Sequence, residues 1–287
     1  MPISFQNVSF VYSPKTPFAS KALQNISFAI DNGQFVAIVG KTGSGKSTIA
    51  QLLNALLTPT EGSVVVDDFT NEPKMRKKGK EVKALRKHVG LVFQFPEYQL
   101  FEETVEKDVS FGPRNFGLSK EESLKKAHDA LRMVGLDESF DKRSPFDLSG
   151  GEKRKVAIAG ILALDPEVLI VDEPTSGLDP KAAEDTMALF KKINESGKTV
   201  LFVTHDMDLV LECASLAVVV NDGKVEEVVK PSMLFGKDLS SYSLSNPQVF
   251  EFALRLKEKG FTIDFSNLRT VSDLGKAIAD AYREKKR

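Results

Sequence analysis

Hydrophobic residues along the chain follow two different patterns. Short, uninterrupted apolar runs at residues 35–40, 89–94, 168–174 and 199–206 predict strands buried on both faces of a sheet. Residues 3–12 and 23–30 alternate apolar and polar positions more loosely and predict strands joined by polar turns. Ile49, Leu52, Leu53 and Leu56 have helical spacing, and a further helix is expected around residues 181–194. Buried strands that alternate with helices predict a doubly wound α/β fold with a mostly parallel core sheet.

Shorter elements complete this scheme. "GSVVVDD" indicates a hairpin-like piece, and residues 216–229 indicate an edge hairpin that turns at 221–223. From about residue 95 to 148 the pattern is helical and polar, with Pro and Gly between the helices, as in an inserted lobe. Beyond about residue 233 the composition shifts to two short amphipathic helices, the second opened by Thr270 and Asp273 in a capping pattern. We therefore expect a main domain at 1–232, with a helical subdomain at about 95–150, and a helical extension at 233–287.

Composition narrows the class of protein. Of 287 residues, 41% are hydrophobic and 28% charged, as in ordinary globular proteins. Because 39 Lys and Arg balance 40 Asp and Glu, the net charge produces no electrostatic field that would favour binding to nucleic acid or to an anionic membrane. Cys213 is the only cysteine, which excludes an intramolecular disulfide and favours a reducing compartment. No apolar run approaches the roughly 18 residues that cross a bilayer, so a membrane role is expected to come through a partner. The basic run at 74–88 lacks interleaved aromatics and is interpreted as a solvated loop, with no nucleic-acid partner expected.

The strongest chemical signal is the loop "GKTGSGKS", which starts at Gly40 between a buried strand and a helix. Glycines let successive backbone N–H groups face one centre, and the helix N-terminus adds a positive partial charge. Lys46 is expected to bridge the β- and γ-phosphates, and Ser47 to ligate Mg²⁺. The loop predicts binding of a nucleoside triphosphate.

Polar side chains at the ends of two other apolar strands extend this prediction. Asp172 ends one strand, where it can reach the Mg²⁺ shell, and the adjacent Glu173 can polarise the attacking water. His205 ends another and is expected to open on the same crevice, where it can contact the γ-phosphate or orient water. His88 and His128 are expected to be solvated.

A second glycine turn, "LSGGE" at 148–152, follows the helical lobe and opens another helix. Ser149, Gly150 and Gly151 therefore form another helix N-terminus suited to an anion. Because the turn is not expected to fold back onto the nucleotide of its own chain, we predict that it closes over a γ-phosphate held by a two-fold related partner.

These motifs, in this order, resemble the ATP-binding-cassette (ABC) ATPases over residues 1 to about 230, which implies a P-loop NTPase fold with an N-terminal antiparallel β subdomain. The resemblance implies that Tyr12 stacks on adenine, that Gln94 opens the Q-loop and helps to hold Mg²⁺, and that Asp179 belongs to the D-loop. The family's signature usually ends in Gln, whereas this chain has Glu152, whose charge would need compensation from Lys153 or Arg154. The residues expected to bind nucleotide are Tyr12, Gly40, Lys41, Thr42, Gly43, Ser44, Gly45, Lys46, Ser47, Thr48 and Asp172, with Glu173, His205 and Gln94 as catalytic residues.

Within the family, three classes compete. DNA-repair ATPases need a long coiled coil between phosphate loop and signature, but only residues 49–147 intervene here, without sustained heptads. Ribosome-associated members resemble two fused cassettes, and this chain has one phosphate loop. An ATPase of a membrane importer is therefore favoured, with another importer class or a soluble ABC ATPase as the alternative.

Residues 93–119 indicate the importer subtype. "PEYQLF" and "FGPRN" resemble stretches of the energy-coupling factor (ECF) transporter ATPases. That resemblance implies a peripheral protein at the cytoplasmic face of the membrane, a second ATPase that is a paralogue, a transmembrane scaffold subunit that contacts Glu97 and Tyr98, and a separate membrane protein that captures a vitamin or a transition-metal ion. The carboxy-terminal helices would help the two ATPases to pair.

Overall fold

The apolar runs of the sequence form the central sheet of the protein, which we describe from a computed structural model covering residues 3–74, 79–236, 238–265 and 268–285. The sheet has the strand order β10-β9-β3-β8-β7-β6, and all neighbours are parallel except the β9–β10 pair. Its strands are β3 (Phe35–Val39), β6 (Val89–Val92), β7 (Val168–Asp172), β8 (Thr199–Val203), β9 (Leu216–Asn221) and β10 (Lys224–Val229). The predicted edge hairpin is confirmed, with its turn at Asp222 and Gly223.

The parallel register brings the ends of the central strands together. Ile38 of β3 is opposite Val203 of β8, and Asp172 of β7 is opposite the same Val203. Because parallel strands run in one direction, the segments that follow β3, β7 and β8 leave the sheet at one edge. This edge therefore carries the phosphate loop after β3, Asp172 at the end of β7 with Glu173 after it, and His205 after β8.

A second, antiparallel sheet has the order β2-β1-β4-β5. Its strands are β1 (Ile3–Tyr12), β2 (Ser20–Ile30), β4 (Glu61–Val66) and β5 (Phe69–Asn71). Helix α1 (Lys46–Leu53) shares one hydrophobic cluster with both sheets, so its apolar face fixes the phosphate loop against them. The expected extension of this helix to Leu56 is wrong: α1 ends at Leu53, and the left-handed Ala55 (φ 52°) turns the chain so that Leu56 is exposed.

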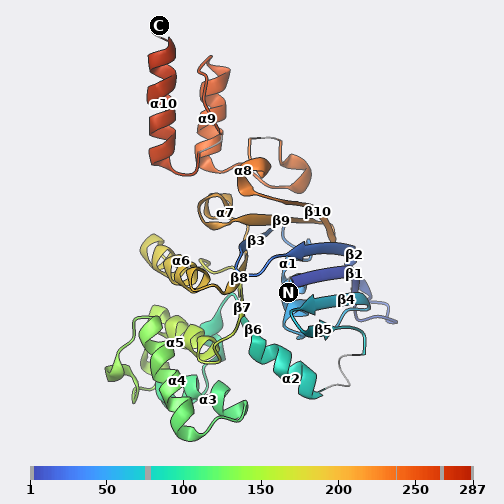
Figure 1. Ribbon diagram of the computed structural model, residues 1–287, viewed down its shortest axis with the longest axis vertical. Helices are drawn as coiled ribbons and strands as arrows, with labels where there is room; N and C mark the ends of the chain where they lie inside the picture. Colours follow the sequence, from blue (N-terminus) through green and yellow to red (C-terminus); the bar gives the residue numbers. More distant parts are fainter. Residues whose placement is uncertain (1–2, 75–78, 237, 266–267, 286–287) are drawn as a thin grey trace.

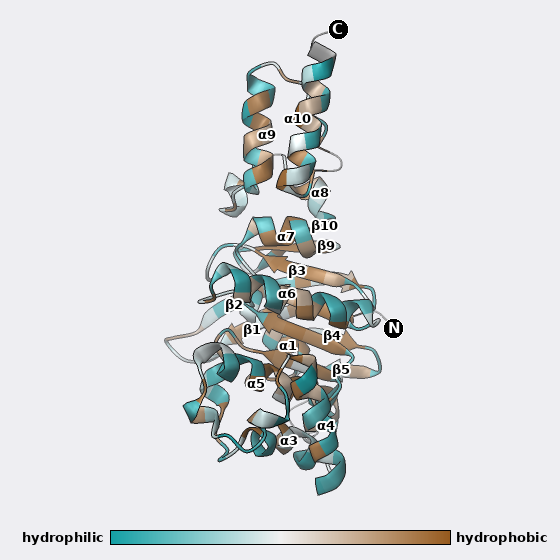
Figure 2. Cartoon of the chain, turned by 90° about the vertical axis from the view of Figure 1, so that its left-hand side faces the viewer, coloured by the Kyte–Doolittle hydropathy of each residue, from teal (hydrophilic) through white to brown (hydrophobic). Residues whose placement is uncertain are grey.

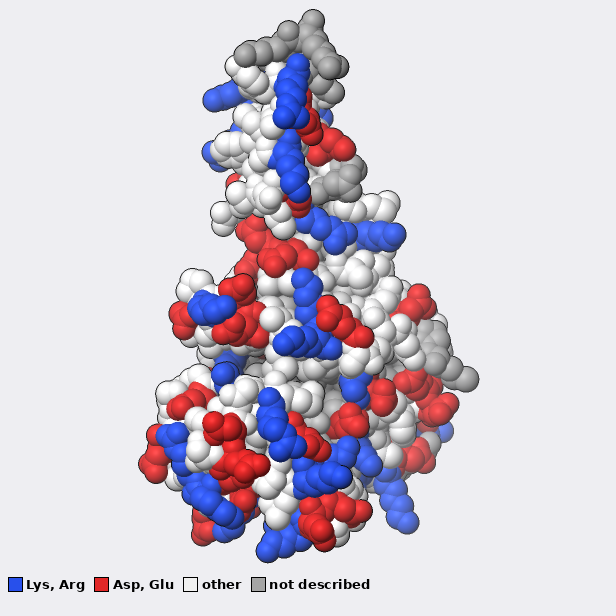
Figure 3. Space-filling model, turned by 60° about the vertical axis from the view of Figure 1, so that its left-hand side comes forward, with Lys and Arg blue, Asp and Glu red and all other residues white. Residues whose placement is uncertain are grey.

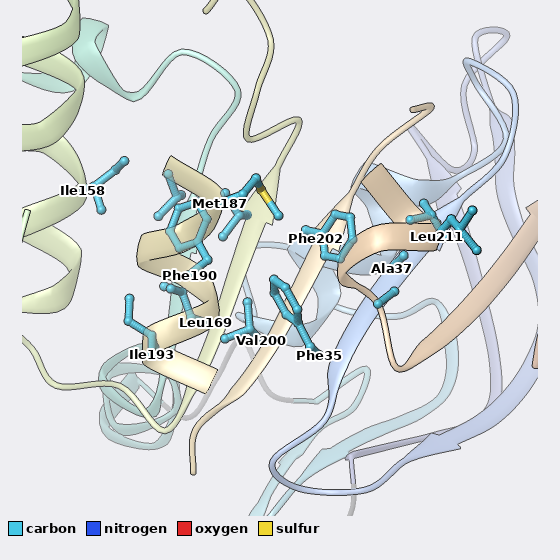
Figure 4. Close-up of a cluster of buried hydrophobic side chains, with 14 of the residues drawn as sticks. Phe35, Ala37, Ile158, Leu169, Met187, Phe190, Ile193, Val200, Phe202 and Leu211 are labelled. Carbon is cyan, nitrogen blue, oxygen red and sulfur yellow. The ribbon is translucent and has the colours of Figure 1, made fainter. Parts of the chain in front are cut away.

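Helices cover the other face of the central sheet. In Figure 4, Phe35 of β3 and Phe202 of β8 lie beside each other, with ring centroids 5.1 Å apart, and Phe190 of α6 packs in the same cluster. This face is covered by α5 (Gly150–Leu162), α6 (Pro180–Glu195) and α7 (Met207–Cys213). In Figure 2 the central strands are largely hydrophobic, as the apolar runs predict.

The helical lobe lies at one end of the molecule (Figure 1). It contains α3 (Val105–Asn115) and α4 (Lys120–Met133), which contact each other and α5, together with short 3-10 turns at Pro96–Gln99, Glu138–Phe140 and Pro145–Asp147. On the face in Figure 3, positive and negative side chains intermingle over this end rather than forming areas of one sign.

The carboxy-terminal helices form a hairpin at the opposite end (Figure 1). α8 (Pro231–Leu234) is followed by a 3-10 turn at Ser240–Tyr242 and then by α9 (Gln248–Glu258) and α10 (Val271–Lys285), which contact each other. The predicted cap is confirmed, because the N–H and the hydroxyl of Thr270 donate to Asp273 at 3.0 and 2.8 Å. A domain boundary after residue 232 falls inside α8 and stays a prediction.

Two expectations about the basic run and the histidines need correction. Residues 79–88 form helix α2, not a loop, since Leu85 is buried against the sheets; residues 75–78 of the run lie outside the described residues. His88 and His128 are not simply solvated. Both are partly buried beside a carboxylate, His88 Nε2 being 2.6 Å from Asp67 and His128 Nε2 3.2 Å from Asp141. No helix within the described ranges is both long and apolar enough to cross a bilayer.

Candidate functional site

The phosphate loop follows β3 directly and ends where α1 begins at Lys46. Gly40, Gly43 and Gly45 have φ values of 150°, 81° and 112°, conformations that side chains with a Cβ rarely adopt. A Cβ at Gly40 would lie 2.0 Å from the carbonyl oxygen of Val220, and one at Gly45 would lie 2.9 Å from that of Ala22. Packing against β9 and β2 therefore requires glycine at both ends of the loop.

Lys46 crosses the loop with its side chain. Its Nζ donates to the carbonyl oxygens of Gly40 at 2.7 Å and Lys41 at 2.9 Å. Burial lowers the pKa of Lys46, and the negative charges of Glu173 and Asp172 oppose this shift. The ammonium group is thus held over the loop, between the backbone and the two acids, where it can attract phosphate oxygens.

The two acids occupy different surroundings although they are adjacent. Burial raises the pKa of Asp172, an effect opposed by the hydrogen bond from Ser47 and by the charge of Lys46. Glu173 has a left-handed backbone (φ 48°), and its N–H donates to Val203 of β8 at 2.9 Å. This turn separates the two carboxylates, so that Asp172 faces Ser47 and Glu173 faces His205, whose Nδ1 is 3.0 Å from Glu173 Oε1.

Gln94 and Tyr12 border the same hollow. Nε2 of Gln94 donates to Ser176 Oγ at 3.1 Å, which leaves its amide oxygen as an acceptor. The hydroxyl of Tyr12 is 3.1 Å from Thr48 Oγ1, and its ring is half-exposed at the rim, a position suited to stacking.

One hollow thus gathers most of the residues predicted to bind and hydrolyse a nucleotide: Tyr12, Thr42, Gly43, Gly45, Lys46, Ser47, Thr48, Gln94, Asp172, Glu173 and His205. Gly40 and Ser44 belong to the loop behind its surface, and Lys41 points outward to Asp222, 2.6 Å away. Ser20, Lys21 and Ala22 of β2 also line the hollow. Sequence reasoning missed them, because they belong to no motif and approach the loop only through sheet packing.

The second glycine turn lies elsewhere. Ser149 caps α5, and Ser149, Gly151 and Glu152 line a separate groove with Asp179 and Lys181, while Gly150 is the first residue of the helix. Asp179 caps α6, accepting the N–H of Ala182 at 3.0 Å. The sequence analysis predicted that this turn would not reach the chain's own Lys46, and in the structure the two lie in separate hollows.

Of the two cations considered for compensating Glu152, Arg154 is directed elsewhere, and the charges that act on Glu152 are those of Arg143 and Lys155 rather than Lys153. Arg154 is buried and donates to the carbonyl oxygens of Pro174 at 2.7 Å, Ser176 at 2.9 Å and Glu173 at 3.5 Å. The guanidinium closest to Glu152 belongs to Arg143, 3.9 Å away. Arg154 was missed as a supporting residue because its partners are backbone groups about 20 positions further along the chain, which leave no trace in the sequence pattern.

Glu97 and Tyr98 lie on the 3-10 turn that follows Gln94. Tyr98 is 84% exposed, and its ring lies 6.1 Å from that of the partly exposed Phe95. Glu97 is half-buried, and within the described residues its buried Oε2 has no hydrogen-bond partner, although its charge acts on Arg154. The structure thus turns Tyr98 outward and Glu97 partly inward.

Comparisons with known proteins show which family the chain resembles. Residues 23–176 match the family model described as ABC transporter. The energy-coupling factor transporter ATP-binding protein EcfA2 of Spiroplasma kunkelii is 49% identical over 289 residues, covering 99% of this chain and 94% of that protein. EcfA2 of Streptococcus pyogenes serotype M5 (strain Manfredo) is 51% identical over 267 residues, covering 92% and 94%.

Two solved structures are also similar. One is cbiO1 of Clostridium perfringens, part of the ABC transporter complex cbiONQ, with a TM-score of 0.72, 34% identity, and coverage of 90% of this chain and 96% of that one. The other is the ATP-binding cassette MJ0796 in a dimeric post-hydrolysis state with ADP and Pi, with a TM-score of 0.69, 34% identity and coverage of 80% and 98%.

Proposed function

The chain belongs to the ABC transporter family as one of its ATPases, and we propose that it powers an importer of the energy-coupling factor type by closing over ATP with a second cassette. It binds and hydrolyses ATP, and this hydrolysis is coupled to transport through membrane components. The observation that supports this mechanism is that the predicted catalytic residues and the second glycine turn lie on two separate surfaces. One hollow holds Lys46, Glu173 and His205, and a different groove holds Ser149.

Within the hollow, each group has a role that its position supports. The N–H groups of the loop and Lys46 bind the phosphates, and Glu173 accepts a proton from the attacking water. His205, held by the carboxylate of Glu173 at 3.0 Å, orients the γ-phosphate. The ring of Tyr12 takes the adenine.

The donor set fits a magnesium ion. The Ser47 hydroxyl is hydrogen-bonded to Asp172, and Gln94, which carries an amide oxygen, lines the same hollow. Hydroxyl, carboxylate and amide oxygens are hard ligands of the kind that Mg²⁺ prefers. When bound, the ion would neutralise part of the charge that develops on the phosphates.

The position of the turn at Ser149 supports pairing of two cassettes. Because it faces outward in its own groove, its N–H groups reach a γ-phosphate only when a second cassette presents one. The exposed apolar side chains Phe252 of α9 and Val271 of α10 suit the carboxy-terminal hairpin to a contact between cassettes. A paralogous ATPase is the proposed partner.

Exposed aromatic rings support a proposed attachment site for the membrane scaffold. Phe95 and Tyr98 form one pair and Phe101 and Phe111 another, the latter with centroids 4.9 Å apart, and all four rings are at least 42% exposed. Exposed aromatic pairs of this kind, the first of which begins directly after Gln94, suit the helices of a transmembrane subunit. We propose that movement at Gln94 during closure pulls on that subunit and that this chain lies at the cytoplasmic face of the membrane. A separate membrane subunit would capture the solute, a vitamin or a transition-metal ion.

The decisive experiment replaces the general base. Glu173→Gln should retain ATP binding, lower steady-state hydrolysis about 10²- to 10⁴-fold and accumulate ATP-bound, paired cassettes that light scattering detects. Normal turnover, or a loss of turnover without pairing, would contradict the mechanism.

A further inference from the structure

The helix that begins at the second glycine turn is capped by its own glutamate. The N–H and the hydroxyl of Ser149 both donate to Glu152 Oε2, at 2.8 and 2.7 Å, and the N–H of Glu152 donates back to Ser149 Oγ at 3.4 Å. The hydrogen bonds from the Ser149 side chain and backbone hold the pKa of Glu152 below its ordinary range. A carboxylate is therefore fixed in its ionised form at this helix N-terminus.

The second oxygen of this carboxylate has a weaker partner. Oε1 of Glu152 lies 3.9 Å from a guanidinium nitrogen of Arg143, whose side chain is half-exposed and stacked over Phe140 with 4.8 Å to the ring centroid. A pair at this distance near the surface is screened by water and neutralises the charge only in part. The charge of Lys155 also acts on Glu152, and Lys181 lines the same groove, so cations near the carboxylate compensate its charge in part.

We propose that Glu152 restrains closure of the cassettes, because it occupies the hydroxyl of Ser149 and holds a negative charge where the partner's γ-phosphate must dock. This inference rests on the proposed action of Ser149 across the dimer. On closure, the hydroxyl of Ser149 would donate to a phosphate oxygen instead, and Glu152 would lose one of its two short hydrogen bonds. The carboxylate and the phosphate would also approach each other. Both effects raise the ATP concentration that closure requires.

Replacement by glutamine separates charge from capping. A Ser-x-x-Gln sequence forms the same capping box, so Glu152→Gln preserves the helix start while removing the negative charge. In the assembled complex we expect the ATP concentration for half-maximal hydrolysis to fall about three- to tenfold, a coupling of ordinary size. The maximal rate should change by less than about twofold, because Glu173 and His205, which act on the attacking water, are untouched.

The chain offers a matched control. Ser119 and Glu122 form the same box at the start of α4, with contacts of 3.0, 2.7 and 3.2 Å, away from both the hollow and the groove. Glu122→Gln therefore reproduces any effect of weakening a capping box without changing the charge at Ser149. We expect it to leave the half-saturating ATP concentration at the wild-type value.

Salt provides a readout that a purely structural role would not move. Since ions screen an exposed charge, the difference between wild type and Glu152→Gln should shrink as ionic strength rises from about 0.05 to about 0.5 M. The proposed restraint is wrong if Glu152→Gln leaves the ATP concentration for half-maximal hydrolysis unchanged or raises it. It is also wrong if Glu122→Gln lowers that concentration as much as Glu152→Gln does. If Glu173→Gln fails to pair with ATP, the failure instead belongs to the proposed function.

Discussion

The imidazole Nδ1 of His205 lies 3.0 Å from the carboxylate Oε1 of Glu173, although 32 residues separate them in the sequence. Glu173 is largely buried, with 16% of its side chain exposed, whereas 76% of the His205 side chain is exposed. The contact therefore joins a fixed carboxylate to a side chain that faces the open hollow. His205 can therefore contact a γ-phosphate in the hollow and Glu173, the proposed general base, at the same time.

Removing this imidazole should slow hydrolysis without abolishing nucleotide binding. We expect His205→Ala to lower the maximal ATPase rate about 10²-fold, since Glu173 and the γ-phosphate lose the group that orients them. His128→Ala is the matched control, because His128 pairs with Asp141 in the helical lobe and lines no part of the hollow. Steady-state kinetics should show a loss in the first variant only; equal losses would assign the effect to stability.

The glycine at the start of α1 should not tolerate a methyl group. In Gly45→Ala, the new Cβ would come within 2.9 Å of Leu23 and Ala22, so the loop must shift and ATP affinity should fall more than about tenfold. Gly117 has a similar φ of 99°, but open space surrounds its Cβ position. Gly117→Ala should therefore cost about 1–2 kcal/mol of folding stability from backbone strain and leave ATP affinity unchanged. Binding titrations of both variants test the distinction, and unchanged affinity in Gly45→Ala would refute it.

Arg154 should matter for stability and for the position of Glu173. Arg154→Met keeps the aliphatic stem but leaves three carbonyl groups of the loop after β7 without their donor. We expect a loss of about 3 kcal/mol in the free energy of unfolding, together with slower hydrolysis. Lys155→Met, on the exposed side of the same helix, should leave the free energy of unfolding unchanged. Chemical denaturation alongside ATPase assays would check both variants, and a wild-type stability of Arg154→Met would contradict the bracing role.

The proposed membrane contact should depend on the exposed aromatic side chains and on Glu97. Tyr98→Ala and Glu97→Gln should reduce co-purification with the transmembrane subunit while sparing nucleotide binding, because neither side chain lines the nucleotide hollow. Glu121→Gln, exposed on α4, serves as the control. Undiminished recovery of the membrane subunit with both variants would discard this surface as the attachment site.

The single thiol gives a test through pH. Burial is the main cause that raises the pKa of Cys213 to about 11, from an ordinary value of 9.0. Because the thiolate is the reactive form, its fraction at pH 8 would be about 0.1%, roughly 100-fold below that of a thiol with the ordinary value. Alkylation of the folded chain should therefore stay slow up to pH 9 and accelerate as pH rises toward 11. Rapid labelling at pH 8 would show that Cys213 at the end of α7 is accessible and unshifted.

Several features followed from the sequence alone because they depend on short-range rules. Continuous apolar runs identified the strands of the parallel sheet, and the Gly40–Ser47 spacing identified the phosphate loop. Thr270 and Asp273 identified a helix cap, since capping involves residues three apart. The same rules misjudged the end of α1 and the basic helix α2, where burial of Leu85 stabilises a segment rich in charge.

Only the tertiary structure decided which distant groups meet. The order of the strands in the central sheet places His205 against Glu173, and hydropathy patterns do not specify that order. Packing of α5 against the segment after β7 directs Arg154 to backbone carbonyls and leaves Glu152 to Ser149 and Arg143. Sequence patterns encode local backbone conformation and burial, whereas contacts between remote residues arise from the register and packing of whole elements. For that reason the sequence predicted the chemistry of the phosphate loop but not the partners of Glu173 and Glu152.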